Sequence, residues 1–419
     1  MLGLVLTAGG ARGAYQAGVL RRISEIPALA RRPLPFAIVT GASAGAINGV
    51  ALAARSGNFG NAALEIALLW SQLRVEQVFR SDVPSLLTTG ATLARDFVLG
   101  GLFGSTLTSG FFDTSPLEAM LRNAFPHGGI ADAIRRNQVY AVAVTATSYH
   151  SGRSYTFIEG RSGHPVWNKS RRVVVPGVLT YRHVLASSAI PILFPPARID
   201  DRPDSLWFGD GALRLVAPMS PAIRLGATRI LAVGVRSSRA AATLAREELA
   251  GNAALDAEGG RIASPPLAQV CGVFFNAIFL DHLDADVEHL QRMNTLLTSH
   301  MRGGDDDARD TTIEGMKPIE PLVVSPSEDL ALVAQRFAHR MPRLVRYMLD
   351  GLGIPDAQSA DLMSYLLFDS AFTRTLVDIG WRDADARIDE IEEFVRGADP
   401  LLAEVRQMPV RLHAVGGVE

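Results

Sequence analysis

A serine among small residues is the clearest chemical signal in this 419-residue chain. Gly41-Ala42-Ser43-Ala44-Gly45 fits the pattern G-x-S-x-G, in which a serine occupies a sharp turn between a strand and a helix. All four neighbours of Ser43 are glycine or alanine, so such a turn can form without collisions between side chains. The turn would present the hydroxyl as a nucleophile, and a plain tight turn between packed elements is the alternative interpretation.

A glycine-rich loop near the N-terminus, Ala8-Gly9-Gly10-Ala11-Arg12-Gly13, could bind an anion, because free backbone N–H groups converge where a helix begins. The loop lacks the G-x-G-x-x-G spacing of dinucleotide sites and the Gly-Lys-Ser/Thr ending of phosphate loops. We therefore expect an oxyanion hole for acyl transfer, with a simple turn as the alternative. A cation at a helix start opposes the helix dipole, so Arg12 should have a specific partner unless it is solvated.

A third stretch, Gly209-Asp210-Gly211-Ala212, places an acidic residue between two glycines. Small neighbours allow the backbone to bring the carboxylate close to another group. Asp-Gly is also a common pair in turns, so an ordinary turn is the competing interpretation.

The elements around these motifs predict how they are positioned. A strand at residues 2–7, a helix at 14–26, a strand at 36–40 and a helix from 46 onward form a βαβ unit, whose strands are parallel. Ligands bind at the carboxyl ends of such strands, so the glycine loop and Ser43 should share one edge of the sheet. Further strands are predicted at residues 139–147, 153–158, 229–235 and 319–324.

The pattern changes beyond residue 325. Residues 328–349, 357–379 and 385–395 all have the apolar spacing of amphipathic helices. The sequence thus predicts a catalytic α/β domain over residues 1–325 and a C-terminal helical region over 326–419.

Composition excludes some classes of function. The formal net charge of −2 gives no general attraction to nucleic acid. The single cysteine, Cys271, excludes an intrachain disulfide and is typical of a reducing compartment. The N-terminus lacks a signal-peptide pattern, and no apolar run approaches the roughly 20 residues that a membrane span needs. We expect a cytoplasmic protein without a metal site.

A glycine-rich apolar stretch, residues 97–112, has no clean periodicity. It is either a buried irregular loop or a mobile flap that receives an acyl chain or touches a lipid surface. This stretch and the C-terminal helices are the candidates for peripheral membrane contact.

The three motifs, in this order, resemble those of the patatin-like phospholipase family. The family loop Gly-Gly-Gly-x-Arg/Lys-Gly corresponds to residues 8–13, with alanine in place of the first glycine, and Asp-Gly-Gly/Ala corresponds to Asp210-Gly211-Ala212. Residues 186–196 also resemble a stretch of bacterial members, and the likeness covers roughly residues 1–220. The resemblance implies a three-layer α/β/α fold with a mostly parallel central sheet, followed here by the C-terminal helical region.

The resemblance also implies a Ser-Asp dyad that needs neither histidine, metal nor cofactor. Ser43 would be the nucleophile and Asp210 its base, since a serine hydroxyl needs one. An ordinary aspartate, with a pKa near 3.9, is a poor base, but burial would strengthen it. The N–H groups of Gly9, Gly10 and Ala11 would bind the oxyanion. The implied supporting residues are Arg12, Gly13, Gly41, Gly45 and Gly211.

The predicted function is hydrolysis of lipid acyl esters, as in a phospholipase A or lysophospholipase. A soluble carboxylesterase or thioesterase for short acyl esters and a non-catalytic lipid-binding protein on the same fold are the alternatives. An α/β-hydrolase triad would need a later histidine, such as His282 or His339, but that fold usually has several strands before its elbow. The sequence carries no signal for head group, acyl position or oligomeric state.

Overall fold

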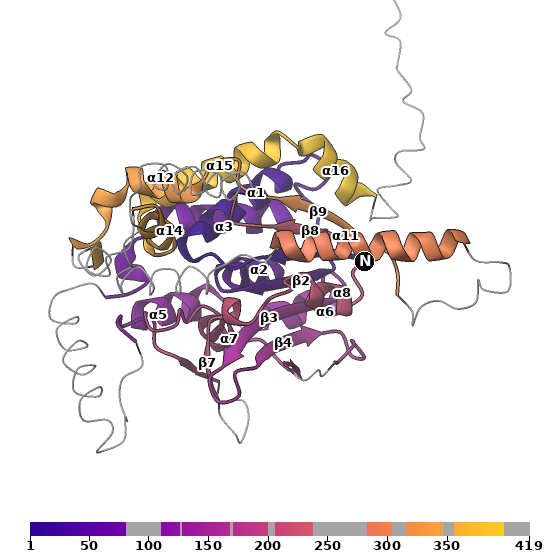
Figure 1. Ribbon diagram of the computed structural model, residues 1–419, viewed down its shortest axis with the longest axis horizontal. Coiled ribbons are helices and arrows are strands. Elements are labelled where there is room, and N and C mark those ends of the chain that lie inside the picture. Colours follow the sequence, from indigo (N-terminus) through magenta and orange to yellow (C-terminus); the bar gives the residue numbers. More distant parts are fainter. Residues whose placement is uncertain are drawn as a thin grey trace, which may run out of the picture.

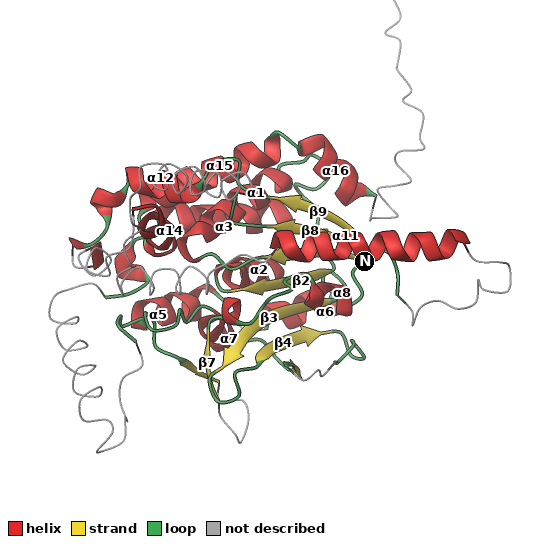
Figure 2. Ribbon diagram, viewed as in Figure 1, coloured by secondary structure: helices red, strands yellow, loops and turns green. Residues whose placement is uncertain are grey.

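The computed structural model describes residues 1–80, 110–125, 128–167, 171–199, 206–237, 283–303, 316–343, 345–346 and 356–397. A nine-stranded sheet crosses the middle of this described part (Figures 1 and 2). Its main path has the strand order β5-β4-β3-β2-β1-β8-β9. In chain order the strands are β1 (Leu2–Leu6), β2 (Ile38–Ala42), β3 (Ala141–Ser148), β4 (Ser154–Gly160), β5 (Arg172–Pro176), β6 (Ala197–Ile199), β7 (Leu206–Gly209), β8 (Arg229–Val233) and β9 (Glu320–Val324).

The sheet is mostly parallel, as the βαβ pattern predicted. Strand β1 pairs in parallel with β2 and β8, β2 with β3, β8 with β9, and β4 with β5. The antiparallel pairs are β3 with β4 and with β7, and β6 with β7. Every residue of β1, β2 and β3 is buried, which explains their nearly continuous apolar sequences.

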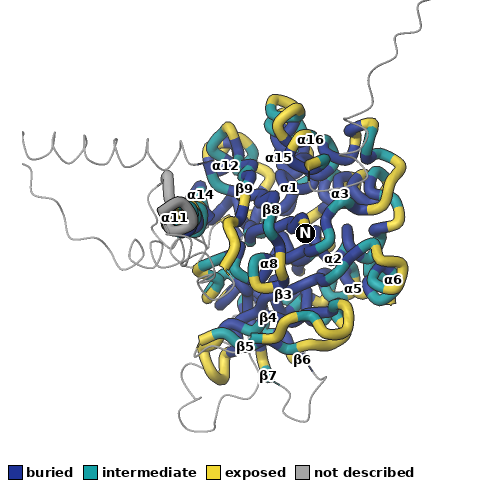
Figure 3. The backbone as a smooth tube through the Cα atoms, turned by 90° about the vertical axis from the view of Figure 1, so that its right-hand side faces the viewer, coloured by how far each residue is buried: buried dark blue, intermediate teal, exposed yellow. Residues whose placement is uncertain are grey.

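Helices cover both faces of this sheet. Alternating side chains of β1 enter two separate cores: Leu4 and Leu6 pack into one, and Val5 into the other. Figure 3 shows α11 on one side of the sheet and α3, α5 and α6 on the opposite side. The first core is covered by helices from both ends of the chain, and the second by the helices α8 (Ser220–Arg224) and α11 (Leu283–Gly303). This is the expected three-layer α/β/α arrangement.

The N-terminal half supplies most of the helices around the site. They are α1 (Gly13–Ser24), α2 (Ala44–Ala54), α3 (Phe59–Gln72), α5 (Ser115–Ala124), α6 (Gly129–Arg135) and α7 (Tyr181–Ser187). Short 3₁₀ turns occur at η1 (Gly10–Arg12), η2 (Val75–Gln77), η3 (Gly211–Leu213) and η5 (Ala338–Arg340). Helix α3 ends at Gln72, and residues 75–77 form the separate turn η2.

The C-terminal helices are α12 (Leu330–Arg336), α14 (Asp356–Leu366), α15 (Ser370–Asp385) and α16 (Ile388–Arg396). Phe372 and Leu376 of α15 belong to the same core as Tyr15 and Val19 of α1, so these helices share the core of the sheet (Figure 1). The boundary at residue 325 stays a prediction.

Two of the long helices predicted from periodicity are interrupted. The helix predicted over 357–379 breaks after α14, because Asp369 accepts hydrogen bonds from the N–H groups of Ala371 and Phe372 and so starts α15. The helix predicted over 328–349 is shorter in the structure: α12 ends at Arg336, the turn η5 follows, and Met341 before Pro342 is extended. No helix in the described ranges is long and apolar enough to cross a membrane. Cys271, His282 and residues 97–109 lie outside the described residues.

Candidate active site

The turn at Ser43 has the backbone of a nucleophile elbow. Strand β2 ends at Ala42, α2 begins at Ala44, and Ser43 between them has φ 53° and ψ −126°. A positive φ is uncommon for a residue with a Cβ atom and costs on the order of 1–3 kcal/mol. Ser43 is 4% exposed, so the strained residue lies at the bottom of a site.

A second serine fixes this turn. The N–H group of Ser43 donates to Oγ of Ser187 at 2.9 Å, and that hydroxyl donates to the carbonyl of Thr145 at 2.6 Å. Ser187 is fully buried at the end of α7. The elbow is thus tied to α7 and to β3, two elements far away in the sequence.

Close backbone contacts bring the three sequence motifs together. A Cβ atom on any of four glycines would lie between 2.2 and 2.6 Å from a neighbouring atom, which no real side chain allows. The contacts are Gly13 with Ala44, Gly41 with Gly45, Gly45 with Leu6, and Gly211 with Thr145. The glycine loop therefore lies against the elbow, and so does the Asp-Gly turn, because a Cβ atom on Gly211 would also lie 3.1 Å from the Ala42 Cβ.

Asp210 follows β7 and is held on several sides. Its N–H group donates to the carbonyl of Ala189 at 2.8 Å, and its own carbonyl accepts from Oγ1 of Thr147 at 2.9 Å. Its Oδ1 accepts the N–H group of Ala212 at 2.8 Å. The other carboxylate oxygen, Oδ2, is buried and accepts no hydrogen bond from the described part of the chain at normal distances.

The environment of Asp210 makes it a stronger base than an ordinary aspartate. The side chain is 1% exposed, and this burial raises its pKa from 3.8 to about 6. The nearby Ser43 hydroxyl and the Ala212 N–H group, which bonds to Oδ1, offset part of that rise. The structure thus brings the predicted acid and the predicted nucleophile together.

Tyr149 is a neighbour of Asp210 that the sequence did not single out. Its N–H group bonds to the carbonyl of Trp207 at 3.0 Å, which holds it beside β7. Burial and the negative charge of Asp210 raise the pKa of the Tyr149 phenol to about 12, so it stays neutral at physiological pH. No local pattern around Tyr149 points to this position.

The glycine loop presents backbone amides that have no partner among the described residues. Gly10 has φ +52°, and α1 begins three residues later at Gly13. The N–H groups of Gly9, Gly10 and Ala11 donate no hydrogen bond to any described residue. Unbonded amides at the start of a helix favour an anion, as an oxyanion hole requires.

Buried amide side chains connect this loop to the elbow. Gln16 donates to the carbonyl of Thr7 at 2.8 Å. Asn48 of α2 donates to the carbonyl of Gly13 at 2.9 Å and to Gln16 Oε1 at 3.0 Å, and it accepts the indole N–H of Trp70 at 2.7 Å. Gln16 and Asn48 are fully buried, so this network fixes the starts of α1 and α2 relative to each other.

Arg12 has the specific partner that its position predicted. The side chain is 2% exposed, forms an ion pair with Asp361 of α14, and donates from Nε to Ser364 Oγ at 2.7 Å. Its guanidinium also lies 4.3 Å from the centre of the Tyr365 ring. Arg12 is therefore directed at the C-terminal helices.

An apolar pocket opens beside Ser43. Gly10, Ser43 and Ser188 are its small or polar members, and the rest of its wall is aliphatic or aromatic. That wall includes Ile47, Leu69, Leu73, Met120, Ile190 and Phe368. The wall is chemically suited to a hydrocarbon chain, but with these side chains in place the free volume of the pocket is only about 30 Å³.

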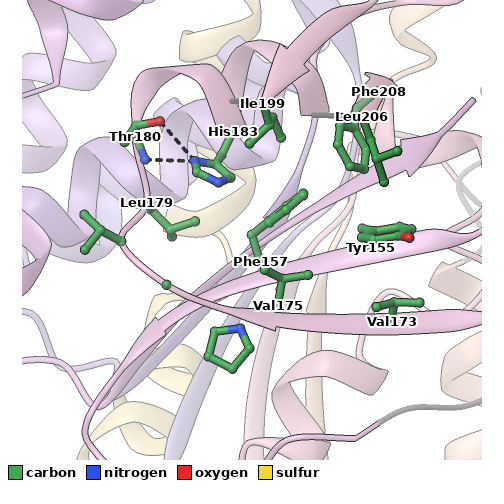
Figure 4. Close-up of a pocket in the computed structure, with 13 residues that line it drawn as sticks. Tyr155, Phe157, Val173, Val175, Leu179, Thr180, His183, Ile199, Leu206 and Phe208 are labelled. Atoms are coloured by element: carbon green, nitrogen blue, oxygen red, sulfur yellow. Dashed lines mark hydrogen bonds between the residues drawn. The ribbon is translucent and has the colours of Figure 1, made fainter. Parts of the chain in front are cut away.

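A larger cavity of about 520 Å³ includes neither Ser43 nor Asp210 (Figure 4). Tyr155, Phe157 and Phe208 line it together with His183 of α7. The His183 ring accepts the Thr180 N–H group at 3.1 Å, so it caps its own helix. We assign no chemistry to this cavity.

The structure does not favour a histidine triad through His339, which is exposed on η5, whereas Ser43 and Asp210 are buried. The described residues contain no group of three or more side chains that could hold a metal ion.

Of the glycine-rich stretch at residues 97–112, only residues 110–112 are described. There, Phe111 and Phe112 donate N–H groups to the carbonyls of Ile192 and Leu193, and Phe112 is buried.

Comparisons with known proteins found one family model and solved structures that match parts of this chain. A family model described as patatin-like phospholipase matches residues 4–223. Two solved structures are similar to the chain at low sequence identity, and no curated protein matches it. For VipD from Legionella pneumophila the identity is 15% and the TM-score 0.27, with 64% of this chain and 58% of that chain covered.

The second structure is the heterodimeric ExoU-SpcU complex of the Pseudomonas aeruginosa type III secretion system. It has 18% identity and a TM-score of 0.23, with 46% of this chain and 36% of that chain covered. This chain thus spans less than two thirds of either relative. The family model, by contrast, spans more than half of the chain and contains all three motifs. The protein belongs to the patatin-like phospholipase family.

Proposed function

We propose that this protein is a serine hydrolase that cleaves acyl ester bonds of lipids with Ser43 and Asp210. The observation that carries the proposal is the buried hydroxyl of Ser43 beside a buried carboxyl whose pKa is about 6. Such a carboxyl is ionised at neutral pH and still basic enough to accept a proton in the transition state. Family membership supports lipid acyl hydrolysis as the general reaction.

In the first half-reaction, Asp210 accepts the Ser43 proton while Oγ attacks the ester carbonyl. The carbonyl oxygen becomes an oxyanion, and the N–H groups of Gly9, Gly10 and Ala11 stabilise it. The protonated Asp210 then gives its proton to the departing alcohol, which leaves an acyl group on Ser43. One oxyanion donor is typically worth about 2.7–4 kcal/mol, so the loop should matter nearly as much as the dyad.

In the second half-reaction, water takes the place of the alcohol. Asp210 removes a proton from this water as it attacks the acyl-enzyme, and the same amides hold the second oxyanion. Collapse of this intermediate returns the proton to Ser43 and releases a carboxylic acid. No step uses histidine or a cofactor.

The apolar wall of the pocket, rather than its free volume of about 30 Å³, supports a lipid over a short ester as the substrate. Aliphatic and aromatic side chains form nearly all of its wall, and each buried CH₂ group adds about 0.8 kcal/mol of binding.

We place the protein in the cytoplasm, in peripheral contact with lipid surfaces. Trp207 and Tyr149, each 44% exposed and joined by a backbone hydrogen bond, are suitable residues for that contact.

The test combines a soluble ester with phospholipid vesicles. Purified protein should hydrolyse p-nitrophenyl butyrate and release fatty acid from phosphatidylcholine vesicles, and Ser43→Ala or Asp210→Asn should abolish both. Asp132→Asn, which changes an exposed carboxylate on α6, is the control and should have no effect. A fluorophosphonate probe should label wild-type protein at Ser43.

Other outcomes separate the alternatives. Turnover of the soluble ester with no action on vesicles would indicate a carboxylesterase or thioesterase. Vesicle binding without turnover or probe labelling would indicate a lipid-binding protein. Wild-type turnover by Ser43→Ala would refute the dyad. Loss of vesicle binding in Trp207→Ala, with turnover of the soluble ester unchanged, would support the proposed lipid contact.

A further inference from the structure

Two parts of the candidate site come from residues far beyond the matched family domain, which ends at residue 223. Phe368 lines the apolar pocket beside Ser43, and α14 contacts the glycine loop. We propose that the C-terminal helices complete the active site. In this proposal Phe368 limits the length of acyl chain that fits, and α14 holds the oxyanion loop in position through Arg12. The inference rests on the proposed function for the nature of the reaction.

Phe368 is held firmly in the wall of the pocket. It lies in the short connection between α14 and α15 and is 6% exposed. Its N–H group donates to the carbonyl of Leu366 at 2.9 Å, and the next residue, Asp369, caps α15. Both ends of the connection are therefore fixed, so the backbone of Phe368 is held between two helices.

Other aromatic rings support Phe368 from behind. Its ring meets Phe79 edge to face at 6.2 Å, and Phe79 stacks on Phe112 at 4.4 Å. Phe194, which also lines the pocket, lies 5.8 Å from Phe79. Since aromatic packing of this kind is dense and the pocket has only about 30 Å³ of free volume, the Phe368 ring fills space that a longer chain would need. The size of residue 368 should therefore set how long a chain fits.

Helix α14 also fixes the glycine loop. The carbonyl of Tyr365 is so close to Gly10 that a Cβ atom there would lie 2.4 Å from its oxygen. Arg12 directly follows the proposed oxyanion amides. Among the described residues, its polar side-chain contacts are all with this helix, to Asp361 and Ser364. The direction of the amides thus depends on where α14 lies. Asp361 and Ser364 act as positioning residues through Arg12.

The first experiment measures chain-length preference. The kcat/KM of p-nitrophenyl palmitate is divided by that of the butyrate for each variant. Phe368→Ala should raise this ratio at least threefold, and Phe368→Trp should lower it at least threefold. Phe394→Ala removes a comparable buried ring on α16, where it packs on Arg229, and should leave the ratio unchanged. Smaller changes, or changes in the other direction, would overturn the role of Phe368.

The second experiment separates positioning from general destabilisation. Asp361→Asn should lower kcat at least tenfold for every chain length, with KM and the palmitate-to-butyrate ratio unchanged. Asp385→Asn removes the exposed ion pair with Arg22 and should leave kcat unchanged. If Asp361→Asn does not yield folded protein, Ser364→Ala carries the test, because it removes the Arg12 Nε bond and the hydroxyl's own bond to the Asp361 carbonyl but keeps the ion pair with Asp361. An unchanged kcat, or an effect confined to KM, would overturn the role of α14.

Failure of this inference is distinguishable from failure of the proposed function. The same esters are first assayed with Ser43→Ala. If that variant loses activity while the Phe368 and Asp361 variants behave like wild type, the dyad stands and the C-terminal contribution is wrong. If Ser43→Ala retains activity, the proposed function itself is wrong.

Discussion

Asp210→Asn should make the protein more stable at neutral pH while it abolishes activity. Burial raises the pKa of Asp210 from 3.8 to about 6, and one pKa unit corresponds to about 1.36 kcal/mol. The ionised carboxylate therefore costs the folded state up to about 3 kcal/mol. Asparagine has nearly the same shape, and its oxygen can still accept the Ala212 N–H group, so the substitution removes the charge and keeps the cap.

The effect has a definite dependence on pH. Between pH 3.8 and about 6 the folded protein holds this proton more tightly than the unfolded chain does, so the contribution of Asp210 to the free energy of unfolding falls as pH rises. The contribution is greatest below pH 3.8 and constant above about 6. The gain from Asp210→Asn should therefore be largest at pH 7.5 and close to zero near pH 4.

Urea denaturation followed by tryptophan fluorescence measures this difference at both pH values. Wild type, Asp210→Asn and the surface control Asp132→Asn are compared. The control should track the wild type, because its carboxylate is exposed. A variant no more stable than wild type at pH 7.5, or an equal gain at pH 4, would show that Asp210 is not a buried, costly charge. The basis for its role as the base would then be lost.

Three further predictions concern the same site. In wild type, kcat/KM should rise with pH to a plateau with a midpoint near pH 6, because Asp210 must be ionised; a flat profile between pH 5 and 8 would contradict this. Ser187→Ala should lower kcat about 10- to 100-fold and destabilise the fold by about 1–3 kcal/mol, because the buried N–H group of Ser43 loses its acceptor. Ester assays measure the change in kcat, and urea denaturation measures the change in stability. Gly10→Ala should abolish turnover and slow fluorophosphonate labelling, although Ser43 is intact. The control Gly128→Ala changes another glycine at positive φ, but one with open space around it, and should have neither effect. Equal labelling rates in the two variants would argue against the role of the loop.

Features encoded by adjacent residues could be predicted from the sequence. The small residues around Ser43 and the β-branched strand before it specify the elbow locally. The parallel pairing of β1 with β2 follows from the helix that connects them. These features depend on sequence separations of a few tens of residues, over which spacing and residue type are informative.

Features that join distant segments could not be predicted in this way. The partner of Arg12 lies 349 residues away on α14, and Ser187 meets Ser43 across 144 residues. Asn48 reads as an ordinary polar position on α2, yet it is fully buried and bonded to two other elements. A single sequence states which groups need partners, as the unusual position of Arg12 did, but not which residues supply them.

Three costly features meet at the carboxyl edge of the sheet. Ser43 has a positive φ, the Asp210 charge is buried, and the amides of Gly9, Gly10 and Ala11 lack partners among the described residues. A protein that only bound lipid through the apolar pocket would gain nothing from any of them, because binding of a hydrocarbon chain needs neither an ionised acid nor free amides. The buried charge would be relieved by Asp210→Asn, and the strained backbone by glycine at position 43. Their coincidence within one buried site therefore favours catalysis over lipid binding alone, because only a charged transition state uses all three at once.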